Sequence, residues 1–93
     1  IKLGRFENIS YEFEINDDKN EAFIINLENM TCPGGVDFSV IVEADGKIIY
    51  DERVASESIL KVKANRRSNY IVTIVNQTNK TLSGKVKINS YVR

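Results

Sequence analysis

The stretch Val40-Ile41-Val42-Glu43-Ala44-Asp45-Gly46-Lys47 decides the fold, because it places a turn signal inside β-rich sequence. The dipeptide Asp45-Gly46 is the strongest short-range signal for a hairpin, since a type I′ turn needs positive φ at both central residues. We therefore predict two strands, at 36–44 and 47–54, that pair across this turn.

Short strands continue outward from this hairpin in both directions, separated by polar turns at intervals of about 8–12 residues. After an irregular lead-in over 1–9, we predict further strands at 10–16, 22–28, 59–64, 70–76 and 81–92. No segment longer than about ten residues repeats its apolar residues with helical period. The sequence therefore predicts an all-β fold, an antiparallel two-sheet sandwich that is jelly-roll-like, with seven or eight strands.

Residues 1–93 form one predicted domain, and because the chain starts at Ile1 we expect it to be excised from a longer protein. Alternation along the strands predicts which side chains face the core. We expect 70–76 to be buried on both sides, as in a central strand. The other predicted core residues are Tyr11, Phe13, Ile15, Phe23, Ile25, Leu27, Val36, Phe38, Val40, Val42, Ile48, Tyr50 or Ile49, Leu60 and Val62.

Charge is divided unevenly along a chain whose net charge is zero. Residues 1–46 carry three basic and ten acidic residues, a balance of −7, and residues 47–93 carry ten basic and three acidic ones, a balance of +7. Either strands from the two halves interleave and cancel their charges, or each half meets a partner of opposite charge. The chain has no overall basic excess, so we expect no nucleic-acid partner, and no apolar run is long enough to predict a membrane span.

Two runs near opposite ends of the chain carry this division locally. Tyr11-Glu12-Phe13-Glu14-Ile15 alternates apolar with acidic residues, and Lys85-Val86-Lys87-Ile88 alternates basic with apolar ones. We predict that these strands pair, with Glu12 and Glu14 facing the two lysines. Each such cross-strand pair of opposite charges contributes about 0.2–1 kcal/mol.

Six runs occur in an order that has a known counterpart: Tyr11 to Ile15, Ala22 to Leu27, Val40 to Lys47, Ser56 to Leu60, Tyr70 to Asn76 and Gly84 to Val92. In this order the chain resembles the bacterial pre-peptidase C-terminal domain and related jelly-roll sandwiches. It departs from them at Asn69, where a glycine is usual, and at Asp37-Phe38-Ser39-Val40, which replaces a more acidic run, so calcium sites of relatives do not transfer. The resemblance implies a non-catalytic accessory domain of a secreted or cell-surface bacterial protein.

Residue types exclude several catalytic chemistries. There is no histidine, so the chain holds no Ser-His-Asp or Cys-His machinery and no histidine-ligated zinc. The single cysteine, Cys32, is expected to act as a small, partly buried hydrophobic residue. We predict a protein that is not an enzyme but an accessory or binding module, extracellular or at the cell surface by resemblance. The alternative is a structural or assembly subunit, such as a surface, pilus or virion component, that uses its oppositely charged halves; a small enzyme is a weaker third possibility.

A ligand site is predicted at Arg66 and Arg67 with Tyr70. Arginine offers a fork of donors to a carboxylate, a phosphate or a sulfated sugar, and a nearby tyrosine ring suits a sugar face. A solvated loop tip is the alternative. The partners expected are other domains of the parent protein, or a protein or polysaccharide surface.

A calcium site is the one cofactor site that the sequence suggests. Asp17, Asp18 and Asn20 offer oxygen ligands within one polar turn, although their spacing is not that of an EF-hand. A metal-free acidic turn is the alternative, and no other cofactor is predicted. Sequons for N-glycosylation begin at Asn8, Asn29, Asn76 and Asn79, and the Asn-rich composition of an AT-biased bacterial genome explains them equally well.

Overall fold

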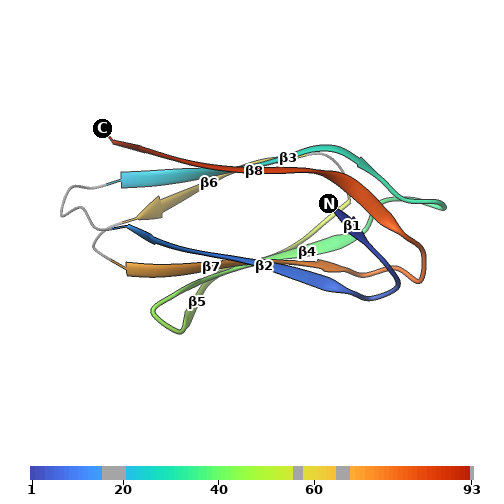
Figure 1. The fold of residues 1–93 in the computed structure, drawn as a ribbon, viewed down its shortest axis with the longest axis horizontal. Coiled ribbons are helices and arrows are strands. Elements are labelled where there is room, and N and C mark those ends of the chain that lie inside the picture. Colours follow the sequence, from blue (N-terminus) through green and yellow to red (C-terminus); the bar gives the residue numbers. More distant parts are fainter. Residues whose placement is uncertain (16–20, 56–57, 65–67, 93) are drawn as a thin grey trace.

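The computed structural model describes residues 1–15, 21–55, 58–64 and 68–92, and every regular element in these ranges is a β-strand. The strands are β1 (Lys2–Leu3), β2 (Asn8–Ile15), β3 (Glu21–Thr31), β4 (Phe38–Ala44), β5 (Lys47–Val54), β6 (Ser58–Ala64), β7 (Ser68–Asn76) and β8 (Leu82–Val92). They form two four-stranded antiparallel sheets that pack face to face, in the orders β1-β8-β3-β6 and β2-β7-β4-β5 (Figure 1). The predicted all-β, two-sheet antiparallel sandwich is confirmed.

The topology follows from the hairpin at its centre. Asp45 and Gly46 have φ of 50° and 82°, both positive as a type I′ turn requires, and β4 pairs with β5 across them. Moving outward from this turn, β3 pairs with β6, β2 with β7 and β1 with β8. The long hairpin then wraps so that β3 also meets β8 and β4 also meets β7, which is the arrangement of a jelly roll.

Strands from the two halves of the chain alternate in both sheets. In each sheet, every pair of neighbours joins one strand from 1–46 to one strand from 47–93. The acidic half and the basic half are therefore always beside each other, and the interleaving interpretation of the charge division holds. Same-half pairing would instead bring strands of like charge together, which costs stability.

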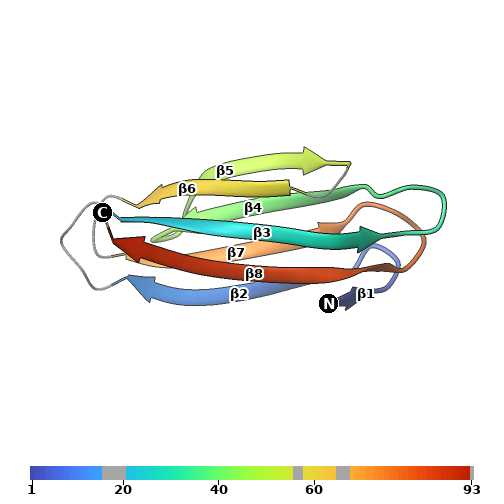
Figure 2. The same cartoon turned by 90° about the horizontal axis from the view of Figure 1, so that it is seen from above.

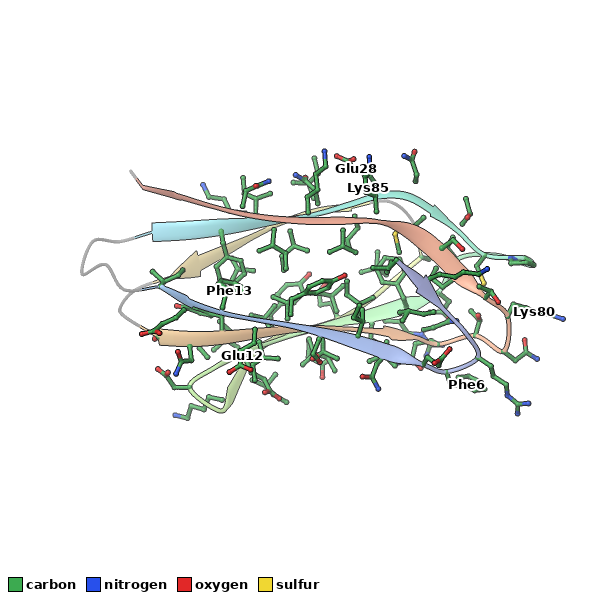
Figure 3. All side chains as sticks on the ribbon, in the orientation of Figure 1. Phe6, Glu12, Phe13, Glu28, Lys80 and Lys85 are labelled. Atoms are coloured by element: carbon green, nitrogen blue, oxygen red, sulfur yellow. The ribbon has the colours of Figure 1, made fainter. Side chains whose placement is uncertain are left out.

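The predicted pairing of Glu12 and Glu14 with Lys85 and Lys87 is wrong, because the two strands lie in different sheets. β2 pairs with β7, whereas β8 pairs with β1 and β3. Figure 3 shows Glu12 on the outer side of one sheet and Glu28 with Lys85 on the outer side of the other. Glu28 stands opposite Lys85 in the register, and its Oε2 lies 3.9 Å from Nζ of Lys87, so the lysines face an acid of β3.

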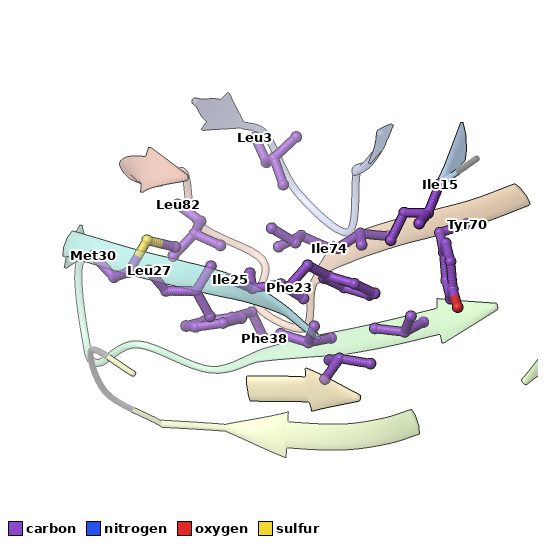
Figure 4. Packing of buried hydrophobic residues seen from close by; sticks show 14 residues of the cluster. Leu3, Ile15, Phe23, Ile25, Leu27, Met30, Phe38, Tyr70, Ile74 and Leu82 are labelled. Atoms are coloured by element: carbon purple, nitrogen blue, oxygen red, sulfur yellow. The ribbon is translucent and has the colours of Figure 1, made fainter. Parts of the chain in front are cut away.

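The core fills the space between the sheets, and the predicted inward faces supply most of it (Figure 4). Phe23 is central: its ring meets those of Phe13 and Tyr70 at centroid distances of 5.1 and 5.0 Å, both edge-on. The buried hydrophobic residues are Leu3, Ile15, Phe23, Ile25, Leu27, Met30, Phe38, Val40, Val42, Val62, Tyr70, Val72, Ile74 and Leu82.

Two expectations about burial need correction. Ile48 and Ile49 of β5 are exposed rather than inward, at 60% and 47% of their surface, while Tyr50 packs partly against the core. The reason is a register shift in β4 and β5: Val42 pairs with Tyr50 but Glu43 pairs with Ile48, so Ile49 is bulged out. β7 is central in its sheet, yet only one of its faces is buried, because the other lies on the half-exposed outer side of the sandwich.

Candidate binding groove

The residues predicted to bind a ligand are not all within the described part of the chain. Arg66 and Arg67 fall outside it, so their role stays a prediction. Tyr70 is described, and its ring lies in the core, 2% exposed and stacked on Phe13 at 5.6 Å between centroids. Its inward direction follows from its place in β7, where alternate side chains point to the facing sheet.

The predicted calcium ligands Asp17, Asp18 and Asn20 also lie outside the described residues, so calcium binding stays a prediction. Within 1–15, 21–55, 58–64 and 68–92, no three or more acidic or cysteine side chains gather closely enough to hold a metal ion.

An open groove of about 450 Å³ runs between β2 and β8. Its lining residues are Tyr11, Glu12, Phe13, Glu14, Ile15, Val86 and Ile88. Ile15 belongs to the buried core, the other apolar members pack against the core from its margin, and the two glutamates are exposed on the β2 side. Figures 1 and 2 show β2 and β8 along the same long side of the sandwich, one in each sheet.

The groove exists because both sheets end there. β2 is the outermost strand of its sheet. In the other sheet β1 lies outside β8, but it is two residues long and pairs only with Leu82 and Ser83. Along the rest of β8, no strand of the described chain covers this edge. Each sheet therefore presents an unpaired strand edge to the groove.

Backbone groups of β2 point into the open edge at every second residue. The N–H of Asn76 donates to the carbonyl of Glu7 at 2.9 Å, which identifies the first hydrogen-bonded pair between β2 and β7. Because such pairs alternate with non-bonded ones in an antiparallel ladder, Ser10, Glu12 and Glu14 direct their N–H and C=O groups away from β7.

The same reasoning applies to β8. The N–H of Gly84 donates to the carbonyl of Ile1 at 3.1 Å, so Gly84 directs its backbone groups toward the β1 side. Alternation then directs the N–H and C=O of Val86 and Ile88 to the same side, where β1 no longer reaches. The groove therefore has an apolar floor, and free backbone donors and acceptors border it on both sides.

This groove was not predicted from the sequence. Its only signal is the alternation of the runs at 11–15 and 85–88, which indicated strands with one apolar face. Burial raises the pKa of the Tyr11 hydroxyl at the groove.

A buried side chain, Asn76, fixes β1 at one end of the groove. Its Nδ2 donates to the carbonyl oxygens of Gly4 at 2.9 Å and Lys80 at 2.7 Å, with that of Leu3 at 3.2 Å. Its Oδ1 accepts from the N–H and the hydroxyl of Thr78, at 3.0 and 2.8 Å. Asn76 is fully buried, so the sequon that it begins serves the fold and offers no accessible amide for a glycan.

Two further polar features lie outside the groove. Cys32 is half-buried, with its Sγ 3.2 Å from Oγ1 of Thr78, in line with the small, partly buried residue predicted. On the other side of the β2 sheet, Arg53 donates to Asp37 through Nε and Nη2 at 2.7 and 2.6 Å. This hydrogen bonding lowers the pKa of the Asp37 carboxyl.

Comparison with protein-family models and with curated proteins finds no match for this chain. The resemblance to pre-peptidase C-terminal domains therefore remains an expectation from the strand pattern. Across the described ranges, the structure contains no helix with the length and apolar character needed to cross a membrane.

Proposed function

We propose that this domain is a non-catalytic binding module of a larger secreted or cell-surface bacterial protein, and that it binds an extended polypeptide segment in the groove between β2 and β8. The observation that carries the proposal is the pair of unpaired strand edges bordering an apolar floor. A segment that adds to a strand edge gains affinity from main-chain hydrogen bonds and specificity from alternate side chains.

The groove supplies both kinds of interaction. Free N–H and C=O groups of Glu12 and Glu14 on one edge, and of Val86 and Ile88 on the other, are available for main-chain bonds. The half-buried Phe13 and its apolar neighbours offer a surface for side chains of the bound segment. A long, uncovered edge strand promotes unwanted pairing with other chains. A bound partner segment would cover this edge.

The alternative function, an assembly subunit, has one observation in its favour. Ile48, Ile49 and Ile59 are exposed on β5 and β6, the strands that end the two sheets on the side away from β2 and β8. The charge division does not by itself call for a second copy, because the two halves already balance each other within one copy. Oligomers in size-exclusion chromatography that weaken in Ile59→Ser would support assembly.

A peptide selection tests the proposed binding function. Random peptides displayed on phage are selected on the immobilised domain, and the winners are measured on Glu12→Pro and on the matched control Glu12→Ala. Proline at position 12 removes an N–H that points away from β7, so the ladder survives while the edge loses a donor.

We expect the selected peptides to bind Glu12→Ala like the parent and Glu12→Pro about tenfold more weakly, which corresponds to one lost hydrogen bond at an open edge. Circular dichroism of both variants checks that the sandwich is intact. Selection that yields no binder, or binders that do not respond to proline at this edge, would overturn the proposed function.

A further inference from the structure

We infer that the groove is the position of an additional strand, which a partner segment occupies. This segment runs antiparallel to both β2 and β8, in line with β1. This inference rests on the proposed function and goes beyond it, because it fixes the direction, the register and the side-chain chemistry of the occupant.

β1 sets the line and the direction. Its residues Lys2 and Leu3 pair antiparallel with Ser83 and Leu82, and Ile1 bonds to Gly84 as the ladder requires. Continued along the same line past Ile1, a strand meets Val86 two residues further and Ile88 four residues further. β1 thus shows where a strand beside the free edge of β8 would lie, and in which direction it would run.

One strand spans the gap between the two edges. Facing sheets of a sandwich lie about 10 Å apart, and neighbouring strands about 4.7–4.9 Å apart, so a single strand midway reaches hydrogen-bonding distance of both. β2 and β8 run in the same direction, as both views of the fold show (Figures 1 and 2). A strand antiparallel to one is therefore antiparallel to the other.

The free backbone groups of the two edges have compatible parity. On β2 they belong to Glu12 and Glu14, whose side chains point outward, and on β8 to Val86 and Ile88, whose side chains point toward the core. In an antiparallel ladder, directly opposite residues share a face. The inserted strand would bond to β2 through its outward-facing residues and to β8 through its inward-facing ones, so no backbone group is needed twice.

The flanking side chains define what the occupant looks like. Its inward residues pack against Val86, Ile88 and the ring of Phe13, so they are apolar. Its outward residues lie between Glu12 on one side and Lys87 on the other, so neutral polar residues fit and a run of like charges does not. The partner segment is thus an extended stretch that alternates β-branched apolar with neutral polar residues.

A designed probe tests this assignment. The probe is a peptide of alternating threonine and valine with a lysine at each end, and the control is a peptide of equal composition in which the valines are consecutive. Hydrogen exchange of backbone amides is followed by NMR on the full chain. Without peptide, the amides of Glu12, Glu14, Val86 and Ile88 should exchange rapidly.

With the alternating peptide we expect hydrogen exchange to slow at least about tenfold at the four amides that face the groove. The amides of Tyr11 and Phe13 are already bonded to β7, so their exchange should not change. A nitroxide at the C-terminus of the peptide should broaden the signals of Leu3, and one at its N-terminus those of Ile15. The consecutive-valine peptide should give neither effect.

Several outcomes would overturn the inference. Slowing on β2 alone or β8 alone means addition to one sheet, and exchanged nitroxide patterns mean a parallel strand. Equal binding of both peptides means that the groove does not require alternating apolar and polar residues. After addition to β2 alone, a parallel strand or equal binding of both peptides, the phage-selected peptides would still lose affinity on Glu12→Pro, so the proposed function would stand. Addition to β8 alone would also abolish the proline effect and would overturn the inference and the function together. Loss of that proline effect is the result that brings down the function itself.

Discussion

Replacing Asn76 by alanine tests the most connected polar side chain of the fold. The change removes the donors to the carbonyls of Gly4 and Lys80 and the acceptor for Thr78. Gly4 lies in the turn before β2, and Thr78 and Lys80 lie in the turn between β7 and β8, so Asn76 joins these two turns. Asn76 is fully buried whereas its partners are partly buried, so water can replace only part of the lost hydrogen bonding.

The magnitude follows from the bonds. The amide has two hydrogens, which serve the two shorter contacts, and its oxygen accepts from the N–H and hydroxyl of Thr78. Three or more partly buried hydrogen bonds to this buried side chain, at about 1 kcal/mol each, give a loss of about 3 kcal/mol in the free energy of unfolding. A domain of this size has about 5–15 kcal/mol in total, and its melting temperature should fall by about 12–24 °C.

Urea unfolding followed by circular dichroism measures the loss. Asn79→Ala is the matched control, because this asparagine is exposed in the same turn and should change stability by less than about 0.5 kcal/mol. If Asn76→Ala loses less than about 1 kcal/mol, the network is not what joins β1 to the rest of the sandwich, and the reasoning fails.

Three further perturbations address other contacts. Lys87→Gln and Glu28→Gln together should cost less than the sum of their separate losses by about 0.2–1 kcal/mol, as a double-mutant cycle in urea would report; no such coupling would contradict the contact between Glu28 and Lys87. Hydrogen bonding from Arg53 lowers the pKa of Asp37, so the pair stabilises the fold at pH values above the ordinary pKa of a carboxyl, and this contribution is lost as the pH falls through the lowered pKa. The stability of the parent relative to Asp37→Asn should therefore decrease on acidification. A difference that stays constant with pH would refute the contribution of the pair. Gly84→Ala should destabilise by about 1–3 kcal/mol in the same assay, because the added Cβ would collide with Sδ of Met30 and lie 3.1 Å from its Cα and 3.2 Å from the carbonyl oxygen of Glu28; an unchanged midpoint would contradict this close approach of β3 to β8.

Local features of the fold could be predicted because neighbouring residues determine them. The turn at Asp45-Gly46 needs only two residues with positive φ, and the inward faces need only alternation. Strand order is different, because alternation says which face of a strand is buried and not which strand lies beside it. Alternation therefore did not reveal that the run at 11–15 pairs with β7 in one sheet, whereas the lysines of β8 face Glu28 of β3 in the other.

The groove could not be predicted from the sequence for the same reason. An open edge is a property of the strand order, and its backbone parity depends on single contacts such as that of Gly84 with Ile1. The bulge that exposes Ile49 likewise leaves no trace in composition. Arg66, Arg67 and the acidic turn at 17–20 remain predictions from residue type alone.

The alternation of the two halves has a consequence for how the chain is made. While a ribosome synthesises residues 1–46, none of the first four strands has a neighbour, because each of them pairs only with strands from the second half. The nascent segment is thus a set of apolar strands without a sheet, the kind of chain that aggregates. Its seven excess negative charges favour repulsion between copies of this segment, which opposes such aggregation until the basic half emerges.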